Sequence, residues 1–197
     1  MSAVAEDAEL LVRLRDGDEA AFAQLVERYQ NRLLRFARSI VQSGAVAEEV
    51  VQDTWMAVVR GLERFEGRGS FKSWLFSILA NRARSAGARE QRSGTPAGPA
   101  LDPSNFDGTG AWLHPVEPWT ERSDERLDAA RWMPAMRAAL EELPERQRQV
   151  VVLRDVEGLS GDEVCAVLSL SSGNERVLLH RARTQLRQTL QARMGRG

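Results

Sequence analysis

Residues 160–183 read SGDEVCAVLSLSSGNERVLLHRAR, and this stretch decides the fold of the C-terminal part of the chain. Its first half carries apolar residues at helical spacing and predicts a short helix over about residues 162–168. The sequence Ser-Leu-Ser at 169–171 predicts a turn, and an arginine-rich helix is expected to follow over about residues 172–194. A short helix, a tight turn and a basic helix are typical of a helix-turn-helix unit.

The charge of the last predicted helix favours binding to nucleic acid. Residues 172–197 contain six arginines and one acidic residue, Glu175, which leaves a net charge of +5. A solvated helix face remains the alternative, but charge of one sign directly after a turn suits duplex DNA, which carries one phosphate charge per ~1.7 Å of its axis. We expect residues 171–176 to face base edges, and Arg181 and Arg183 to lie nearer the DNA backbone.

Two prolines precede this unit and predict two further helices. Pro134 and Pro144 each suit the first turn of a helix. The first of these helices is expected to end near residues 142–143, and the second to run to Gly158. Together with the helix-turn-helix unit they define a C-terminal domain over residues 129–197.

The first 92 residues predict a bundle of four amphipathic helices, because apolar residues recur at the helical period throughout. Asp18 is expected to cap the second helix, which carries apolar residues as far as Ile40 and is expected to end at Ser43-Gly44. Ser70 is expected to cap the fourth, after a glycine-containing loop. The apolar positions of the third helix are Val46, Val50, Val51, Trp55, Val58, Val59 and Leu62. The fold class predicted for the whole chain is therefore all-α.

Composition divides the chain of 197 residues into three parts. Five of the seven prolines fall between positions 96 and 118, so residues 93–128 predict an acidic linker without regular structure. Residues 1–92 carry a net charge of +1, the linker −5 and residues 129–197 +3, which add up to the total of −1. The near-neutral total argues against coating of nucleic acid by bulk charge, but it conceals two weakly basic ends.

Several classes of function are excluded by what the sequence lacks. The one cysteine, Cys165, rules out an internal disulfide, and together with two scattered histidines it is too little for a zinc site. No nucleophile elbow, phosphate-binding glycine loop with lysine or His-Glu metal motif occurs, so we expect neither an enzyme nor a cofactor nor a small-molecule substrate. No apolar run approaches the roughly 18 residues of a membrane span, and the N-terminus lacks a signal-peptide core, so a cytoplasmic protein without direct membrane insertion is expected.

The two predicted domains resemble a known family. LPERQRQVVVLRDVEGLS at 143–160, followed by HRAR at 180–183, resembles the fourth domain of bacterial sigma factors. AEEVVQDTW at 47–55, with FKSWL and ANR on the helix that begins at Phe71, resembles the second sigma domain. Two such domains joined by a short linker resemble the extracytoplasmic-function (ECF) sigma factors of bacterial RNA polymerase, over roughly two thirds of the chain.

The resemblance implies promoter-specific transcription initiation without catalytic activity. It implies binding to core RNA polymerase at the β′ clamp helices and β flap, to promoter DNA, and to an anti-sigma factor. The residues implied for core polymerase binding are Glu49, Gln52, Asp53 and Trp55. Those implied for recognition and melting of the −10 element are Arg68, Ser70, Lys72, Trp74, Asn81, Arg82 and Arg84. Those implied for the −35 element are Ser171, Ser172, Asn174, Glu175, Arg176, His180, Arg181 and Arg183.

The roles of several residues, and the function itself, each have more than one interpretation. Trp55 and Trp74 fit a core position at least as well as a contact with a partner. SSGNERVL at 171–178 departs from the family's usual start of this helix, so base reading by Glu175 and Arg176 is a hypothesis. Residues 104–120 are either a nucleic-acid mimic inside the polymerase or a spacer. A dimeric helix-turn-helix regulator and, less favoured, an all-helical enzyme are the alternative functions.

Overall fold

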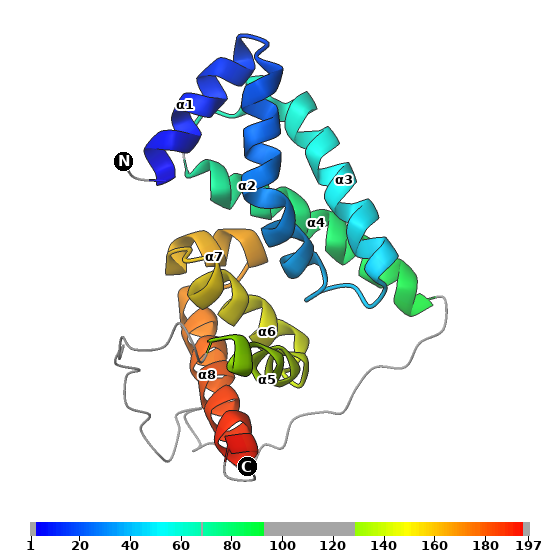
Figure 1. The fold of residues 1–197 in the computed structure, drawn as a ribbon, viewed down its shortest axis with the longest axis vertical. Coiled ribbons are helices and arrows are strands. Elements are labelled where there is room, and N and C mark those ends of the chain that lie inside the picture. The colour runs from blue at the N-terminus through cyan, green and yellow to red at the C-terminus, as the bar shows by residue number, and fades with distance from the viewer. Residues whose placement is uncertain (1–2, 68, 93–128, 195–197) are drawn as a thin grey trace.

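The structure is a computed structural model that describes residues 3–67, 69–92 and 129–194. Every regular element of these residues is helical (Figure 1), so the all-α fold class is confirmed. The first domain comprises α1 (Ala3–Arg15), α2 (Glu19–Ala37), α3 (Gly44–Gly61), a 3₁₀ turn (Leu62–Arg64) and α4 (Phe71–Arg92). The second comprises α5 (Ala129–Glu141), α6 (Glu145–Val151), a π-helical turn (Val152–Val156), α7 (Gly161–Leu168) and α8 (Ser172–Met194). The expected linker lies outside the described residues.

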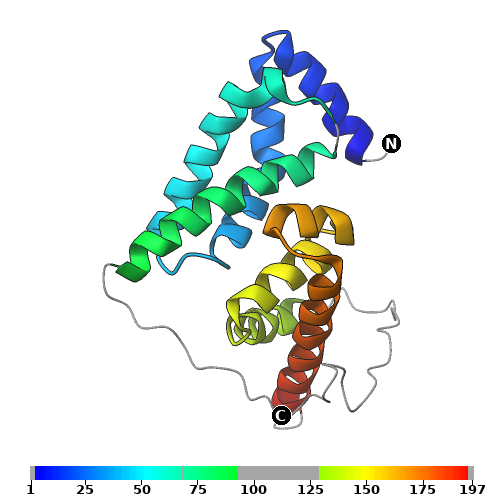
Figure 2. The ribbon, with the colours of Figure 1, turned by 180° about the vertical axis from the view of Figure 1, so that it is seen from behind.

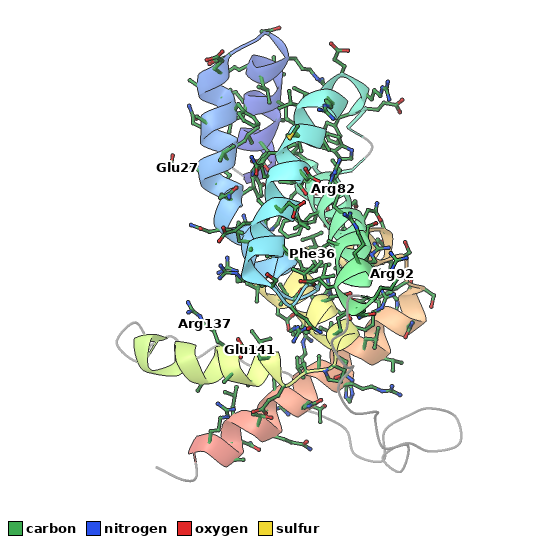
Figure 3. The ribbon with its side chains drawn as sticks, turned by 90° about the vertical axis from the view of Figure 1, so that its right-hand side faces the viewer. Glu27, Phe36, Arg82, Arg92, Arg137 and Glu141 are labelled. Atoms are coloured by element: carbon green, nitrogen blue, oxygen red, sulfur yellow. The ribbon has the colours of Figure 1, made fainter. Side chains whose placement is uncertain are left out.

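The first domain packs α2, α3 and α4 around an apolar core. Phe36 of α2 and Phe76 of α4 are fully buried, with ring centroids 5.5 Å apart, and Figure 3 shows Phe36 between the helices. Asp18 begins α2 as predicted, because its carboxylate accepts the backbone N–H groups of Ala20 at 2.9 Å and Ala21 at 3.3 Å. The periodicity and the cap thus place the α2 face that carries Phe36 against α4.

Two local predictions for this domain are wrong. Helix α2 ends at Ala37 rather than at residue 43, because Ser39 and Ile40 donate backbone hydrogen bonds three residues back and tighten the chain into a turn. Ser43 instead caps α3, since its hydroxyl accepts the backbone N–H of Val46 at 3.5 Å. Val59, expected on the buried stripe of α3, is 56% exposed because it lies about 100° around the helix from the buried Val58 and so falls outside the stripe.

The second domain contains the predicted helix-turn-helix unit in α7 and α8. Ser160 and Glu163 form a capping box at the start of α7, where each side chain accepts the backbone N–H of the other residue. The turn is made by Ser169, whose φ of 55° and ψ of 51° place it in the left-handed region. Pro144 directly precedes α6, whereas α5 begins five residues before Pro134, so the first-turn prediction for Pro134 is wrong.

The two domains contact each other through α7. Both Figure 1 and Figure 2 show α7 beneath α2 and α4, and α4 packs against α7. Long-range hydrogen bonds cross this junction: Arg148 of α6, for example, donates to the carbonyl oxygen of Ser39 at 3.0 Å from Nη2 and 3.2 Å from Nε. Burial lowers the pKa of Arg148, against the charges of Glu145 and Glu141. The junction is therefore polar as well as packed.

Candidate nucleic-acid interface

The exposed side of α3 carries three of the four residues expected to bind polymerase. Glu49, Gln52 and Asp53 are all exposed. Farther along the same helix, Met56 is 47% exposed and Val59 is 56% exposed. Large apolar side chains held in water beside polar ones are typical of an interaction surface.

Trp55 lies beside this exposed side of α3 and is turned into the core of the domain. It is 7% exposed, and its ring meets Phe22 edge-on with centroids 5.6 Å apart. Its indole Nε1 donates a hydrogen bond to the side-chain oxygen of Gln30 at 2.7 Å. A groove of about 580 Å³ between α2 and α3 is lined by the edge of Trp55 together with Met56 and Val59. Trp55 thus anchors the border of this surface to the core and contributes little exposed area itself.

A second groove joins residues expected to serve two different partners. It has a volume of about 1030 Å³ and lies between α3 and α4, with Glu49, Asp53 and Asn81 in its lining. Arg82 Nη1 lies 3.3 Å from Asp53 Oδ2, and both side chains are partly exposed. Figure 3 shows Arg82 on α4. The expected polymerase surface and part of the expected −10 surface are therefore contiguous.

The start of α4 holds an aromatic cluster. Ser70 caps the helix as predicted, since its hydroxyl oxygen accepts the backbone N–H of Ser73 at 3.1 Å. Trp74 packs against Phe65 and Phe71, with ring centroids 4.9 Å and 5.9 Å away, and is half-buried. Trp74 is thus chiefly a packing residue that fixes the loop before α4. Arg68, expected to contact −10 DNA, lies outside the described residues.

Three of the residues expected at −10 DNA, Ser70 among them, form hydrogen bonds to the second domain. The Ser70 hydroxyl donates to the Glu163 carboxylate, and Lys72 Nζ donates to the carbonyl oxygen of Glu157. Arg84 Nη2 donates to the carbonyl oxygen of Val167 at 2.8 Å. Burial lowers the pKa of both Lys72 and Arg84, with Arg32 acting in the same direction on Lys72 and Arg146 on Arg84.

The start of α8 presents most of the residues expected at −35 DNA to solvent. Ser171 accepts the backbone N–H of Asn174 at 3.3 Å and so caps the helix. Arg183 is exposed and forms two hydrogen bonds to Asp155, at 2.6 Å and 2.9 Å, which raise its pKa. The exposed members of the set are Ser171, Ser172, Asn174, Arg176 and Arg183, whereas His180 and Arg181 are half-buried.

Glu175 does not belong to this exposed set. It is 4% exposed, and its carboxylate lies 3.1 Å from Arg154 Nε. A buried carboxylate that is already ion-paired within its own domain does not reach a base edge, so base reading by Glu175 is corrected to a structural role. Position 175 faces inward because it lies one helical turn before the buried Leu179.

Sequence reasoning missed Met56, and it placed Val59 in the core. The available signal was spacing, since Gln52, Met56 and Val59 follow one another at i+4 and i+7 on one side of α3. Within the described ranges no group of three or more potential metal ligands occurs. Nor does any helix there have the length and apolar character required to cross a membrane.

Comparison with known proteins assigns both domains. The family described as Sigma-70 region 2 matches residues 25–93, and Sigma-70, region 4 matches residues 134–186. The ECF RNA polymerase sigma-E factor of Escherichia coli (strain K12) is 32% identical over 184 residues, which cover 93% of each chain. The RNA polymerase sigma-H factor of Pseudomonas aeruginosa is 29% identical over 187 residues, 94% of each.

Two solved structures share the arrangement of helices. CnrH, in complex with the cytosolic domain of CnrY, has a TM-score of 0.61 and 28% identity, and the match covers 95% of this chain and 98% of CnrH. The sigma factor RpoE of Bartonella quintana, in complex with the anti-sigma factor NepR, has a TM-score of 0.60 and 26% identity over 86% of this chain and 96% of RpoE. With both regions matched in the expected order, the chain belongs to the sigma-70 family as an ECF sigma factor, which directs RNA polymerase to initiate transcription at promoters.

Proposed function

We propose that the exposed side of α3 holds core RNA polymerase, that the start of α4 captures the −10 element, and that the start of α8 reads the −35 element. In this proposal residues 1–92 form the polymerase-binding and −10 domain, residues 93–128 the linker, and residues 129–197 the −35 domain. The observation that carries it is the exposure of Met56 and Val59 next to Gln52, on a helix that Trp55 anchors to the core.

The α3 surface suits a helical partner. Its centre is apolar, at Met56 and Val59, and its rim is polar, at Glu49, Gln52 and Asp53. Such a centre and rim are the usual anatomy of a protein–protein interface, and an apolar groove beside a helix can accommodate another helix. The β′ clamp helices of the polymerase are the partner we assign to it, and the β flap is assigned to the second domain.

The two proposed DNA surfaces suit different forms of DNA: the start of α4 suits unpaired bases, and the start of α8 suits the duplex. Capture of an unpaired base requires an aromatic wall and polar or charged groups, which the start of α4 combines in Trp74, Ser70 and Lys72. Reading of duplex DNA requires an exposed basic helix start, which α8 offers with Asn174 and Arg176. Arg183 lies two turns farther along α8, where phosphate contacts are expected.

Regulation by an anti-sigma factor is part of the proposal. The related CnrH and RpoE structures contain CnrY and the anti-sigma factor NepR, respectively, which supports a partner of this class for the present chain. We also propose that the chain acts in the cytoplasm, where polymerase and chromosome are located, and that it has no catalytic activity of its own.

Reconstitution tests the proposed function. The full chain is mixed with core RNA polymerase and a library of promoter fragments, and the transcripts are sequenced. Specific initiation that requires both components is expected, and core polymerase alone serves as the control. Binding to duplex palindromes as a dimer, without any initiation, would instead identify a conventional helix-turn-helix regulator.

A further inference from the structure

The side chain of Glu157 is fully buried at the junction between the domains, although the residue belongs to the loop after the π-helical turn of the second domain. Its Oε2 accepts a hydrogen bond from Arg32 Nε at 2.7 Å, and Arg35 Nη2 lies 3.9 Å from its Oε1. Its backbone carbonyl oxygen accepts the Lys72 ammonium. Three cations of the first domain, from α2 and α4, therefore converge on one acidic residue of the second.

The cations converge because the first domain itself holds them together. Arg32 and Arg35 are three residues apart and so share one side of α2. The Arg32 guanidinium lies over the ring of Tyr29, 5.3 Å from its centroid. Tyr29 in turn meets Phe71 edge-on, with centroids 5.9 Å apart, and Phe71 is the first residue of α4. Arg32 is therefore positioned next to the start of α4 without help from the second domain.

The charges are close enough to oppose one another. Burial lowers the pKa of Lys72, and the neighbouring positive charge of Arg32 lowers it further, while Glu157, Glu163 and, less strongly, Asp7 act in the opposite direction. Both ion pairs that Arg32 and Arg35 form in the described part of the chain end on Glu157. If the second domain leaves, the carboxylates of Glu157 and Glu163 leave with it. The three cations then remain together, because Asp7, the carboxylate of the first domain that acts on Lys72, is already bound by Arg28 and Tyr29. Such a cluster of positive charges favours the binding of another anion where the carboxylates had been.

We propose that Arg32, Arg35 and Lys72 form a phosphate-binding site for the promoter strand, and that the Glu157 carboxylate occupies this site in the closed chain. Carboxylate and phosphate oxygens are both bound by the planar fork of arginine, so one can substitute for the other. The inference rests on the proposed −10 function of the adjacent Ser70 and Lys72, and it adds two arginines of α2 to that surface.

Competition for one set of cations follows from this arrangement. DNA and the second domain cannot occupy the cluster together, so the chain reaches −10 DNA only after Glu157 has left. Phosphate contacts of this kind do not depend on base sequence and weaken with salt, with a slope of about 0.7 in log K against log salt for each phosphate of a single strand. This slope makes the site measurable without knowledge of the promoter.

The test uses the full chain and a fluorescent single-stranded oligodeoxythymidine of 20 nucleotides, whose binding is followed by anisotropy at several salt concentrations. Glu157→Gln removes the competing charge and is expected to bind the oligonucleotide several-fold more tightly than the unchanged chain. In that background Arg32→Ala and Arg35→Ala are each expected to weaken binding several-fold and to reduce the salt slope by about 0.7.

Asp162→Asn is the control for Glu157→Gln, because Asp162 is exposed in the same domain. Arg38→Ala is the control for the arginine changes, because Arg38 is exposed just after α2.

The outcomes distinguish a phosphate-binding site from a contact that only joins the two domains. If Arg32 serves only to pair with Glu157, its loss changes nothing once Glu157→Gln has removed that charge, and the proposal is overturned. It is equally overturned if Arg38→Ala weakens binding as much as Arg32→Ala does. The proposed function is tested separately, by initiation from the promoter library with core polymerase. If the unchanged chain supports no initiation, that function is contradicted, whatever the result with the oligonucleotide.

Discussion

Arg154 Nε lies 3.1 Å from Glu175 Oε1, and this pair joins the π-helical turn to the first turn of α8. The carboxylate side chain is 5% exposed and the arginine 30%, and Arg154 Nη1 also donates to the carbonyl oxygen of Leu159 at 2.8 Å. Gly161, the first residue of α7, passes close to the same carboxylate, since a Cβ there would lie 3.8 Å from Glu175 Oε2. The pair thus fixes the start of α8 relative to α7.

Glu175→Ala is therefore expected to destabilise the second domain rather than change its base preference. Removal of one partner of a largely buried ion pair costs about 3–5 kcal/mol, and partial exposure of Arg154 reduces the expected loss to about 2 kcal/mol. Thermal unfolding measures this loss, and initiation from promoters with mutated −35 elements measures selectivity. Arg176→Ala is the matched comparison, expected to weaken −35 selectivity with stability changed by less than about 0.5 kcal/mol. An altered base preference for Glu175→Ala at unchanged stability would restore its base-reading role.

Met56→Glu combined with Val59→Glu is expected to weaken binding to core polymerase at least about tenfold. A carboxylate at the centre of an interface loses its hydration without gaining a partner. Because both positions face solvent, at 47% and 56% exposure, the free energy of unfolding is expected to change by less than about 0.5 kcal/mol. Binding is measured by titration of labelled chain with core polymerase. Val12→Glu on α1 is the control, since Val12 is 58% exposed and distant in sequence from α3; equal effects of the two changes would contradict the assignment.

Ser169→Gly is expected to stabilise the second domain by about 0.5–1 kcal/mol. Ser169 adopts a φ of 55°, in a region that costs a residue with a Cβ about 1–2 kcal/mol, and the greater freedom of glycine in the unfolded chain offsets part of the gain. Its side chain is exposed, so little contact is lost. Thermal unfolding checks the result, with Ser169→Ala as the control that keeps the Cβ and so brings no relief. A lower unfolding temperature for the glycine variant would show that the serine hydroxyl matters more than the backbone.

Acid is expected to loosen the contact between the domains through Glu163. Burial acts to raise the pKa of Glu163, but hydrogen bonds from Ser70 and Ser160 and the charge of Lys72 outweigh it and hold the pKa below the ordinary 4.5. A carboxyl group with a lowered pKa contributes its stability above about pH 4.5 and loses it as the pH falls through the folded-state value. The radius of gyration, measured by X-ray scattering, is therefore expected to rise below pH 4.5.

Glu163→Gln isolates this effect, because glutamine at this position still completes the capping box of α7 but carries no charge. We expect this variant to be expanded already at pH 7 and to respond less to acid. Asp162→Asn should keep the response of the unchanged chain, because Asp162 is exposed. An unchanged radius for Glu163→Gln at pH 7 would assign the closed arrangement to the other contacts of the junction.

Local features of the chain were predictable because they depend on neighbours within one or two helical turns. The helical period and the caps at Asp18 and Ser70 follow from hydrogen bonds that reach two to four residues along the chain. The helix-turn-helix unit and the basic start of α8 are equally local. Predictions of which side of a helix is buried and of where a helix begins were less secure, as Val59 and Pro134 show, respectively.

The sequence by itself therefore determined the all-α class, the order of the two domains and the family to which the chain belongs. Only the tertiary structure decided which side of α3 meets water, that Glu175 is buried against Arg154, and that Ser70, Lys72 and Arg84 are engaged by the second domain. Those last three contacts join residues 93, 85 and 83 positions apart. A charged side chain has the same local pattern whether it faces water, DNA or another domain, and only the packing of distant helices selects its partner.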